Sequence, residues 1–236
     1  MRLMEYLQES INDKGIFKSC MMAGTSNSGK SWVITKITSG QIEPRIVNTD
    51  KFVEFYMDMD PGYDWLKYGD QTKKLTKAQL FNYINSLLPL WIDGTSSNPN
   101  AVLRRKGMLQ SLGYDVSMIF VDTPVETAIE RNKKRNRVVD EDFLVKAYEQ
   151  SMQLKNYYAS EFKVFTEILN GEGELTDEAI LNAYRKMRGF FDGPLMNPIG
   201  QNLIKELKNI GGKYLVDHSE YNMQYLKKLV ENWYRK

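Results

Sequence analysis

Residues 24–31, with the sequence Gly-Thr-Ser-Asn-Ser-Gly-Lys-Ser, constrain the fold of this chain more than any other segment. They match the pattern G-x-x-x-x-G-K-S. The glycines let the backbone wrap closely around an anion, so that successive N–H groups point at phosphate oxygens. The pattern therefore predicts a phosphate-binding loop (P-loop), provided that a strand precedes it and a helix follows it.

The flanking residues fit that condition. Residues 17–23 (FKSCMMA) form a short apolar run between turn residues, which is typical of a buried strand, and we expect a helix over residues 30–39. The loop amides and the start of the helix would bind the phosphates of ATP, Lys30 would reach the β- and γ-phosphates, and the Ser31 hydroxyl would ligate Mg²⁺. The expected nucleotide-binding residues in this loop are Gly24, Thr25, Ser26, Asn27, Ser28, Gly29, Lys30 and Ser31.

Strand and helix patterns alternate through the rest of the first 165 residues. Strands are predicted at 45–48, before Asp93 and at 116–121, and helices at 51–57, 80–87, 99–112, 124–135 and 141–158. Two helices are placed by capping boxes, Thr76 with Gln79 and Thr123 with Glu126, and Asn98 is expected to cap a third. This alternation predicts an α/β three-layer sandwich, in which helices cover both faces of a mostly parallel sheet.

A cluster of glycines and prolines at 188–200 predicts a linker. We therefore expect a core over 1–188 with a lid near 131–140, and a C-terminal helical extension or small cap over 199–236. That extension would contain a helix at 199–210, a strand at 214–216 and a helix at 219–235. A further short helix is expected at 3–12.

The composition excludes several other classes of protein. Lys and Arg total 32 and Asp and Glu total 30, so the chain is neither a polycation nor an acidic disordered tail. One cysteine, Cys20, and one histidine, His218, exclude a cysteine-based zinc site. No apolar run approaches the roughly 18 residues of a membrane helix, and the N-terminus does not resemble a signal peptide. We expect a cytoplasmic protein that does not enter a membrane.

Two aspartates are candidates for the chemistry beyond phosphate binding. Asp93 is followed by Gly94, whereas motor ATPases usually carry a glutamate there to position the attacking water, so the pattern disfavours hydrolysis. Asp50 follows the second predicted strand at the carboxyl edge of the sheet, where it could accept the proton of an acceptor hydroxyl or simply cap a helix. Asp93 could hold Mg²⁺ or orient the substrate, or it could form a structural hydrogen bond to the P-loop.

The segment 131–137 holds five basic residues in seven. In a phosphotransferase such a segment is typical of a lid, whose arginines neutralise the charge on the transferred phosphoryl group. Arg131 and Arg137 are the candidate catalytic arginines, and Arg131 and Arg135 are candidates for contact with the triphosphate. The alternative is a solvated basic helix end favoured by the helix dipole.

Between Ser19 and Tyr148 the chain resembles the zeta-toxin-like and polynucleotide-kinase-like P-loop kinases, including small phage kinases of this kind. The resemblance rests on the P-loop, Asp50, and the segments 92–99 (IDGTSSNP), 112–116 (LGYDV), 130–135 (ERNKKR) and 137–139 (RVV). It implies that Asp50 is the catalytic base, that Asp93 and Thr95 lie beside substrate and metal, and that Arg131 and Arg137 contact ATP. The chain departs from many members at Lys51, where they carry an arginine used with the substrate.

The expected function is that of an ATP-dependent kinase, a phosphotransferase with an alcohol group as acceptor. The acceptor hydroxyl would belong to a nucleic acid or nucleotide, including a hydroxymethylated base in phage DNA, or alternatively to a small metabolite or nucleotide sugar. A nucleotide-binding switch protein without phosphoryl transfer is the other alternative. Tyr63, Trp65 and Tyr68 could stack a base or pack as a loop anchor, and the oligomeric state stays open.

Overall fold

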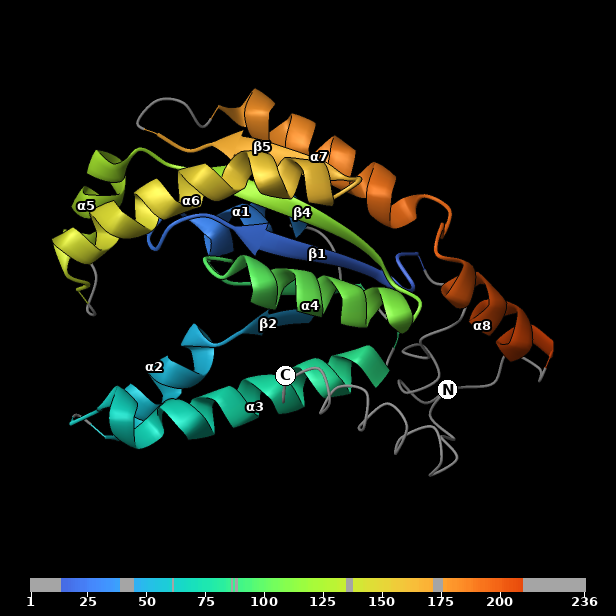
Figure 1. Cartoon of the computed structure of the whole chain (residues 1–236), viewed down its shortest axis with the longest axis horizontal. Helices are drawn as coiled ribbons and strands as arrows, with labels where there is room; N and C mark the ends of the chain where they lie inside the picture. The colour runs from blue at the N-terminus through green and yellow to red at the C-terminus, as the bar shows by residue number, and fades with distance from the viewer. Residues whose placement is uncertain are drawn as a thin grey trace, which may run out of the picture.

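The computed structural model describes residues 14–38, 45–60, 62–85, 87, 89–134, 138–171 and 176–209. These residues form a single five-stranded sheet with the order β2-β3-β1-β4-β5, and every neighbouring pair is parallel (Figure 1). The strands are β1 (Lys18–Ala23), β2 (Arg45–Asn48), β3 (Leu90–Asp93), β4 (Asp115–Asp122) and β5 (Phe165–Leu169). The predicted α/β fold with a parallel sheet is confirmed.

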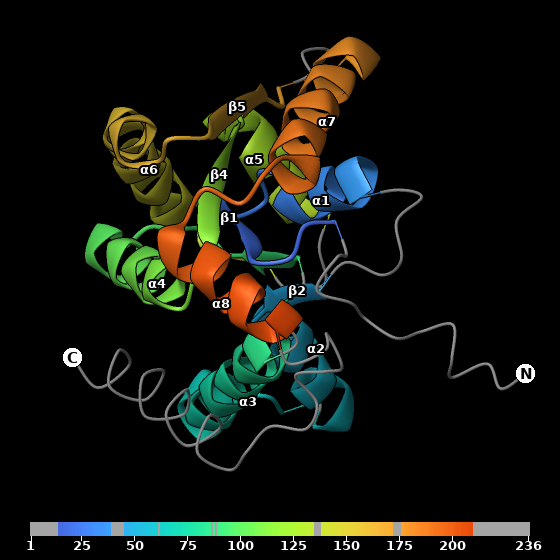
Figure 2. The same cartoon turned by 90° about the vertical axis from the view of Figure 1, so that its right-hand side faces the viewer.

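Helices cover both faces of this sheet. They are α1 (Lys30–Thr38), α2 (Asp50–Met59), α3 (Trp65–Asn85), α4 (Pro99–Ser111), α5 (Val125–Lys133), α6 (Glu141–Glu161), α7 (Asp177–Asp192) and α8 (Pro198–Asn209). Figure 2 shows α1 and α7 on one side of the sheet and α4 and α6 on the other. No helix in the described part of the chain is both long and apolar enough to span a membrane.

The central strand β1 explains the layered core, because its side chains alternate between the two faces and all six residues are buried. Cys20 and Met22 pack with residues of α1 and α7, whereas Met21 and Ala23 pack with residues of α3, α4 and α6. Complete burial raises the pKa of the Cys20 thiol to about 12, so this cysteine is a neutral core residue at physiological pH.

Both predicted capping boxes are wrong. Helix α3 begins at Trp65, so Thr76 lies inside it and donates its hydroxyl to the Thr72 carbonyl at 2.9 Å. Thr123 donates instead to the carbonyl of Ser28 in the P-loop, at 3.0 Å, and Pro124 occupies the capping position of α5. Thr76 therefore lies too far inside α3 to cap it, and Thr123 lies one residue before the capping position of α5. The predicted cap at Asn98 is confirmed, because the Asn98 side chain accepts a hydrogen bond from the Ala101 amide at 3.0 Å.

Strand β5 and helix α7 were not predicted, and the glycine-rich region 188–200 is only partly a linker. Gly189 lies inside α7, and residues 193–197 connect α7 to α8. The division into 1–188 and 199–236 stays a prediction. The helices expected at 3–12 and 219–235, the strand at 214–216 and His218 lie outside the described residues.

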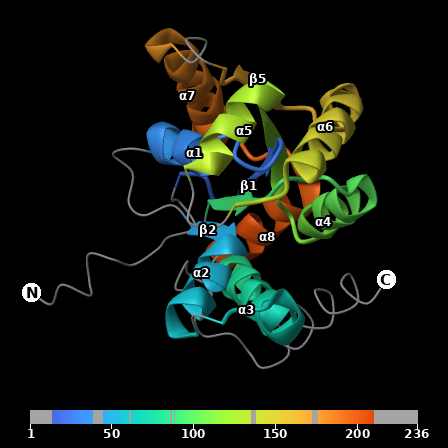
Figure 3. The same cartoon turned by 90° about the vertical axis from the view of Figure 1, so that its left-hand side faces the viewer.

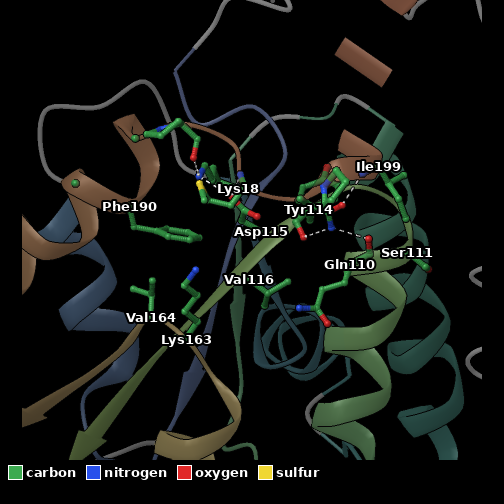
Figure 4. Close-up of a pocket in the computed structure, with 16 residues that line it drawn as sticks. Lys18, Gln110, Ser111, Tyr114, Asp115, Val116, Lys163, Val164, Phe190 and Ile199 are labelled. Carbon is green, nitrogen blue, oxygen red and sulfur yellow. Dashed lines mark hydrogen bonds and ion pairs between the residues drawn. The ribbon is translucent and has the colours of Figure 1, made fainter. Parts of the chain in front are cut away.

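A buried ion pair fastens the segment 193–197 to the amino ends of β1 and β4. Lys18 Nζ donates to Asp115 Oδ2 and to the Pro194 carbonyl, both at 2.8 Å, and lies 4.9 Å from the centre of the Phe190 ring. Asp115 Oδ2 also accepts the Met196 amide at 2.8 Å. This clamp borders a cavity of about 740 Å³ at the amino edge of the sheet (Figure 4). It lies at the opposite end of β1 from residues 24–31.

Candidate active site

The loop between β1 and α1 has a backbone that only glycine accommodates at two positions. Gly24 has φ +132° and Gly29 has φ +84°. A Cβ at Gly24 would stand 2.4 Å from the Val121 carbonyl oxygen, and one at Gly29 would stand 2.5 Å from Asn170 Nδ2. Helix α1 begins at Lys30, directly after this loop, so the positive end of its dipole faces the loop, which is the arrangement that binds phosphate.

Lys30 lies inside the loop, not in solvent. Its side-chain ammonium donates to the carbonyls of Gly24 at 3.2 Å and Thr25 at 2.6 Å, and to Ser28 Oγ at 3.3 Å. Only 8% of Lys30 is exposed, so its positive charge is concentrated at the concave side of the loop. A triphosphate entering this loop would meet that charge together with the backbone amides.

A chain of hydrogen bonds links the P-loop to the carboxyl ends of β2 and β3. Ser31 Oγ donates to Asp93 Oδ2 at 2.6 Å, and Asn48 Nδ2 donates to the same oxygen at 2.9 Å. The Asp50 amide donates to Asn48 Oδ1 at 2.7 Å. Because Asn48 pairs with Asp93 across the two strands, the Asn48 side chain fixes the spacing between the two aspartates.

Burial raises the pKa of the Asp93 carboxyl, and the nearby negative charge of Asp50 adds to that rise. Hydrogen bonds from Ser31 and Asn48 and the positive charge of Lys30 act in the opposite direction, but burial is the largest effect. Ionisation of Asp93 is therefore less favourable in the folded protein than in water, and a cation bound beside the carboxylate would offset this penalty.

The donor set fits Mg²⁺ better than a metal that needs a complete protein cage. No group of three or more histidine, cysteine, aspartate or glutamate side chains gathers within the described ranges. Ser31 and Asp93 bring a hydroxyl and a carboxylate, both hard oxygen ligands, into direct contact. Mg²⁺ is typically bound in this way, through one or two protein oxygens with the remaining ligands from phosphate and water.

These groups line one cleft of about 270 Å³ at the carboxyl edge of the sheet, the edge that faces the viewer in Figure 3. Its lining residues are Ser26, Asn27, Gly29, Lys30, Ser31, Trp32, Asp50, Asp93, Gly94, Thr95 and Arg131. The structure thus brings together residues of the P-loop, the two aspartates, Thr95 and Arg131, which the sequence analysis had singled out as site residues. Their chemical roles stay predictions.

Thr95 joins the cleft mainly through its backbone, because its carbonyl accepts the Gly24 amide at 3.2 Å. Its hydroxyl donates to Ser97 Oγ at 3.3 Å. Arg131 reaches the cleft from α5, and its Nη2 donates to the backbone and side-chain oxygens of Asn170, at 3.1 and 3.3 Å. The other predicted lid arginines, Arg135 and Arg137, lie outside the described residues.

Asparagines are the site residues that sequence reasoning missed. Asn48 joins the aspartates, and Asn170 joins Arg131 to the P-loop. The fully buried Asn132 accepts Asn27 Nδ2 at 3.1 Å and the Val139 amide at 2.9 Å, which connects the P-loop to the predicted lid. One signal was present for Asn48, which directly follows an apolar residue of the strand predicted at 45–48, at the carboxyl edge of the sheet where the P-loop begins.

The aromatic residues near 63–68 pack on one another. The Tyr68 ring stacks on Tyr56 at 4.8 Å and on Tyr63 at 5.7 Å between ring centres. Hydrogen bonds from the Tyr68 hydroxyl, from Lys67 and from the Gly62 amide lower the pKa of Asp60 to about 2, so this carboxylate stays ionised. These contacts favour a structural anchor over a surface open to a nucleic-acid base. The Trp65 side chain lies outside the described part of the structure.

Sequence and structure comparisons agree with this architecture. The sequence model of a family described as an AAA domain matches residues 20–159, more than half of the 236 residues. A protein from Chloroflexus aurantiacus, provisionally assigned as a kinase, superposes with a TM-score of 0.53 at 12% identity, over 74% of this chain and 98% of its own.

More distant structural likenesses are also found. A protein of the PezAT toxin–antitoxin system of Streptococcus pneumoniae gives a TM-score of 0.49 at 17% identity, over 91% of this chain and 93% of that one. A deoxyadenosine kinase from M. mycoides gives 0.45 at 15% identity, over 72% and 99%. No functionally curated protein matches the sequence. The family match over residues 20–159 and the superposition on the Chloroflexus aurantiacus protein agree with the α/β fold described above.

Proposed function

This chain belongs to the AAA-domain family, and from that premise we propose that it is an ATP- and Mg²⁺-dependent kinase that phosphorylates a hydroxyl group. The observation that carries the proposal is the hydrogen-bond chain from Ser31 through Asp93 and Asn48 to Asp50. The Ser31 hydroxyl, the Asp93 carboxylate and the exposed Asp50 carboxylate line the same cleft as the phosphate loop, which supports the proposal.

Each residue in the cleft has a distinct part in this proposal. Lys30 and the loop amides bind the β- and γ-phosphates, and Ser31 with Asp93 would hold Mg²⁺, which neutralises phosphate charge when bound. Asp50 accepts or orients the proton of the acceptor hydroxyl. The acceptor oxygen forms a bond to the γ-phosphorus while the bond from that phosphorus to the bridging oxygen breaks, and ADP leaves.

Arg131 supplies positive charge to the cleft. It is one of the lining residues, and its guanidinium lies beside Gly29 of the P-loop. We assign it to the negative charge that is spread over the phosphoryl oxygens during transfer. Arg135 and Arg137, in the predicted lid, would add to that charge when ATP is bound.

The carboxylates of the cleft support transfer over hydrolysis or a simple switch. Asp50 and Asp93 are the carboxylates that line it, and Gly94 stands where a water-positioning glutamate would follow Asp93. Asp50 also lies in the first turn of α2, where a carboxylate is favoured by the helix dipole, but its exposure in the cleft leaves it open to a second substrate. It suits a second substrate with a hydroxyl to deprotonate.

The proposed acceptor is the hydroxyl of a nucleotide or nucleic acid, including a hydroxymethylated base, as the resemblance to polynucleotide-kinase-like proteins suggests. The second candidate is a small metabolite or nucleotide sugar. One observation favours the second candidate: Tyr63 and Tyr68 stack on one another, which leaves fewer ring faces for bases. The two candidates predict different acceptors in a single assay.

The test is incubation with γ-labelled ATP and a panel of plain and hydroxymethylated DNA, RNA, nucleosides, nucleotides, polyols and sugars. We expect the label in one acceptor class, and a fall in rate of about 100-fold or more in Asp50→Asn, the range of general-base catalysis. Asp58→Asn, an exposed aspartate on the same helix, is the matched control and should keep the wild-type rate. Label found only as inorganic phosphate, with Asp50→Asn unaffected, would overturn the proposal.

A further inference from the structure

Asn170, the residue directly after β5, is held rigidly against the P-loop. It is 4% exposed, its backbone amide donates to the Asp122 carbonyl at 2.7 Å, and its Nδ2 donates to the Ser28 carbonyl at 2.5 Å. Its amide group also lies across Gly29, where any Cβ would collide with it. The glycine is therefore needed partly to make room for this asparagine.

The same asparagine binds one half of the Arg131 guanidinium. Arg131 Nη2 donates to both oxygens of Asn170, the backbone carbonyl at 3.1 Å and the side-chain Oδ1 at 3.3 Å. A long arginine side chain normally samples several rotamers. Here two acceptors on one residue fix the plane and direction of the guanidinium.

The other half of the guanidinium lies beside Gly29 of the P-loop. Arg131 Nη1 is buried and has no hydrogen-bond partner among the described residues. It lies 3.6 Å from the position that a Cβ would take on Gly29, and Arg131 lines the cleft. A buried, unpaired guanidinium N–H is costly and rare, so its presence beside a phosphate loop indicates an anion as the missing partner.

We propose that Asn170 is a positioning residue, which orients Arg131 so that Nη1 can bind a phosphate oxygen of the nucleotide. The inference rests on the proposed function, because the anion is a phosphate of ATP. Asn170 does not touch the phosphate itself. It acts through Arg131 and at the same time ties that arginine to the P-loop carbonyl of Ser28.

The proposal predicts coupling between two residues, which a double-mutant cycle measures. We expect Arg131→Ala to weaken ATP binding about 10- to 100-fold, the range of a charge-assisted hydrogen bond. Asn170→Ala should weaken it measurably but less, because this variant keeps the backbone carbonyl that accepts Arg131 Nη2. The double variant should be no worse than Arg131→Ala alone, because Asn170 has nothing to position once the arginine is gone. Asn156→Ala, an exposed asparagine on α6, is the matched control and should bind ATP normally.

A second measurement separates positioning from mere support of the fold. Guanidinium ion added to Arg131→Ala should restore part of the ATP affinity, and should do so less well in the double variant. Thermal unfolding of every variant checks that the fold is intact.

Calorimetry with ATP and Mg²⁺ is the readout, since it does not depend on knowing the acceptor. Additive losses in the cycle, or loss of thermal stability in Asn170→Ala with ATP affinity unchanged, would overturn the role of Asn170. If ATP binds with the expected coupling but no acceptor is phosphorylated, the positioning role stands and the kinase proposal fails. If wild-type protein does not bind ATP at all, both fail.

Discussion

At the scale of single residues, Asp93 is the side chain on which the cleft depends most. One oxygen of its carboxylate receives both the Ser31 hydroxyl and the Asn48 amide, while burial raises its pKa. The folded protein therefore holds a proton on Asp93 more readily than the unfolded chain does. In consequence, the ionised carboxylate makes folding less favourable above its raised pKa, and this cost disappears as the pH falls.

Replacing Asp93 with asparagine should separate stability from function. Asp93→Asn removes the buried charge and keeps an oxygen that can accept hydrogen bonds from Ser31 and Asn48. We therefore expect the free energy of unfolding at pH 7 to stay the same or to rise by up to about 1 kcal/mol. Mg²⁺-dependent ATP binding should fall at least about 10-fold, because a charged ligand is lost. Calorimetry and thermal unfolding check both.

The pH dependence gives a further check on the same residue. In wild-type protein, Mg²⁺-dependent ATP binding should weaken as the pH falls, starting above the range of an ordinary aspartate, because the raised pKa lets Asp93 take up a proton earlier. Asp93→Asn should show no such Asp93 transition. A variant that is less stable and binds Mg²⁺-ATP normally would contradict the role given to Asp93.

At the scale of elements, strands and helices could be predicted where the local residue pattern determines their bounds and caps. They could not be predicted where contacts with distant parts of the chain determine them. The strand at 45–48 and the cap at Asn98 follow from their own residues. Thr76 and Thr123 form the same local motif as a true cap, yet their hydroxyls bond elsewhere. Strand β5 is short and half exposed at the sheet edge, so its residues carry a weak apolar signal.

The Lys18–Asp115 ion pair attaches the 193–197 segment to the sheet, and its contribution to the free energy of unfolding can be measured. The side chains of Lys18 and Asp115 are only 4% and 14% exposed, so removing one partner leaves a buried charge. We expect Lys18→Met to lower the free energy of unfolding by about 3 kcal/mol, in the range for a broken buried pair. Denaturant unfolding followed by circular dichroism gives the value.

The exposed ion pair between Lys14 and Asp192, the residue directly before the 193–197 segment, provides the control for that measurement. Lys14 and Asp192 lie 3.6 Å apart, and the Lys14 side chain is 74% exposed. Lys14→Met should change the free energy of unfolding by less than about 0.5 kcal/mol. Equal effects of the two substitutions would show that the Lys18 pair does not anchor the 193–197 segment.

At the scale of the whole molecule, the candidate active site lies at one edge of the sheet and a structural ion pair lies at the other. The carboxyl edge carries the loop, the aspartates and Arg131, whereas the amino edge carries the Lys18–Asp115 pair, which holds the 193–197 segment that leads to α8. The position of the site followed from the sequence, because parallel strands bring their carboxyl ends to one edge. The asparagine links did not, since Asn48 and Asn170 belong to segments far apart in the chain.

The central claim, phosphoryl transfer from ATP to a hydroxyl, is tested most directly by stoichiometry. With the acceptor identified, the amount of ADP formed is compared with the amount of phosphorylated acceptor over the same time. The account predicts a ratio of about one, with little ADP formed when the acceptor is omitted, as expected for positioned transfer. ADP that accumulates with inorganic phosphate at the same rate, with or without any acceptor, would contradict it.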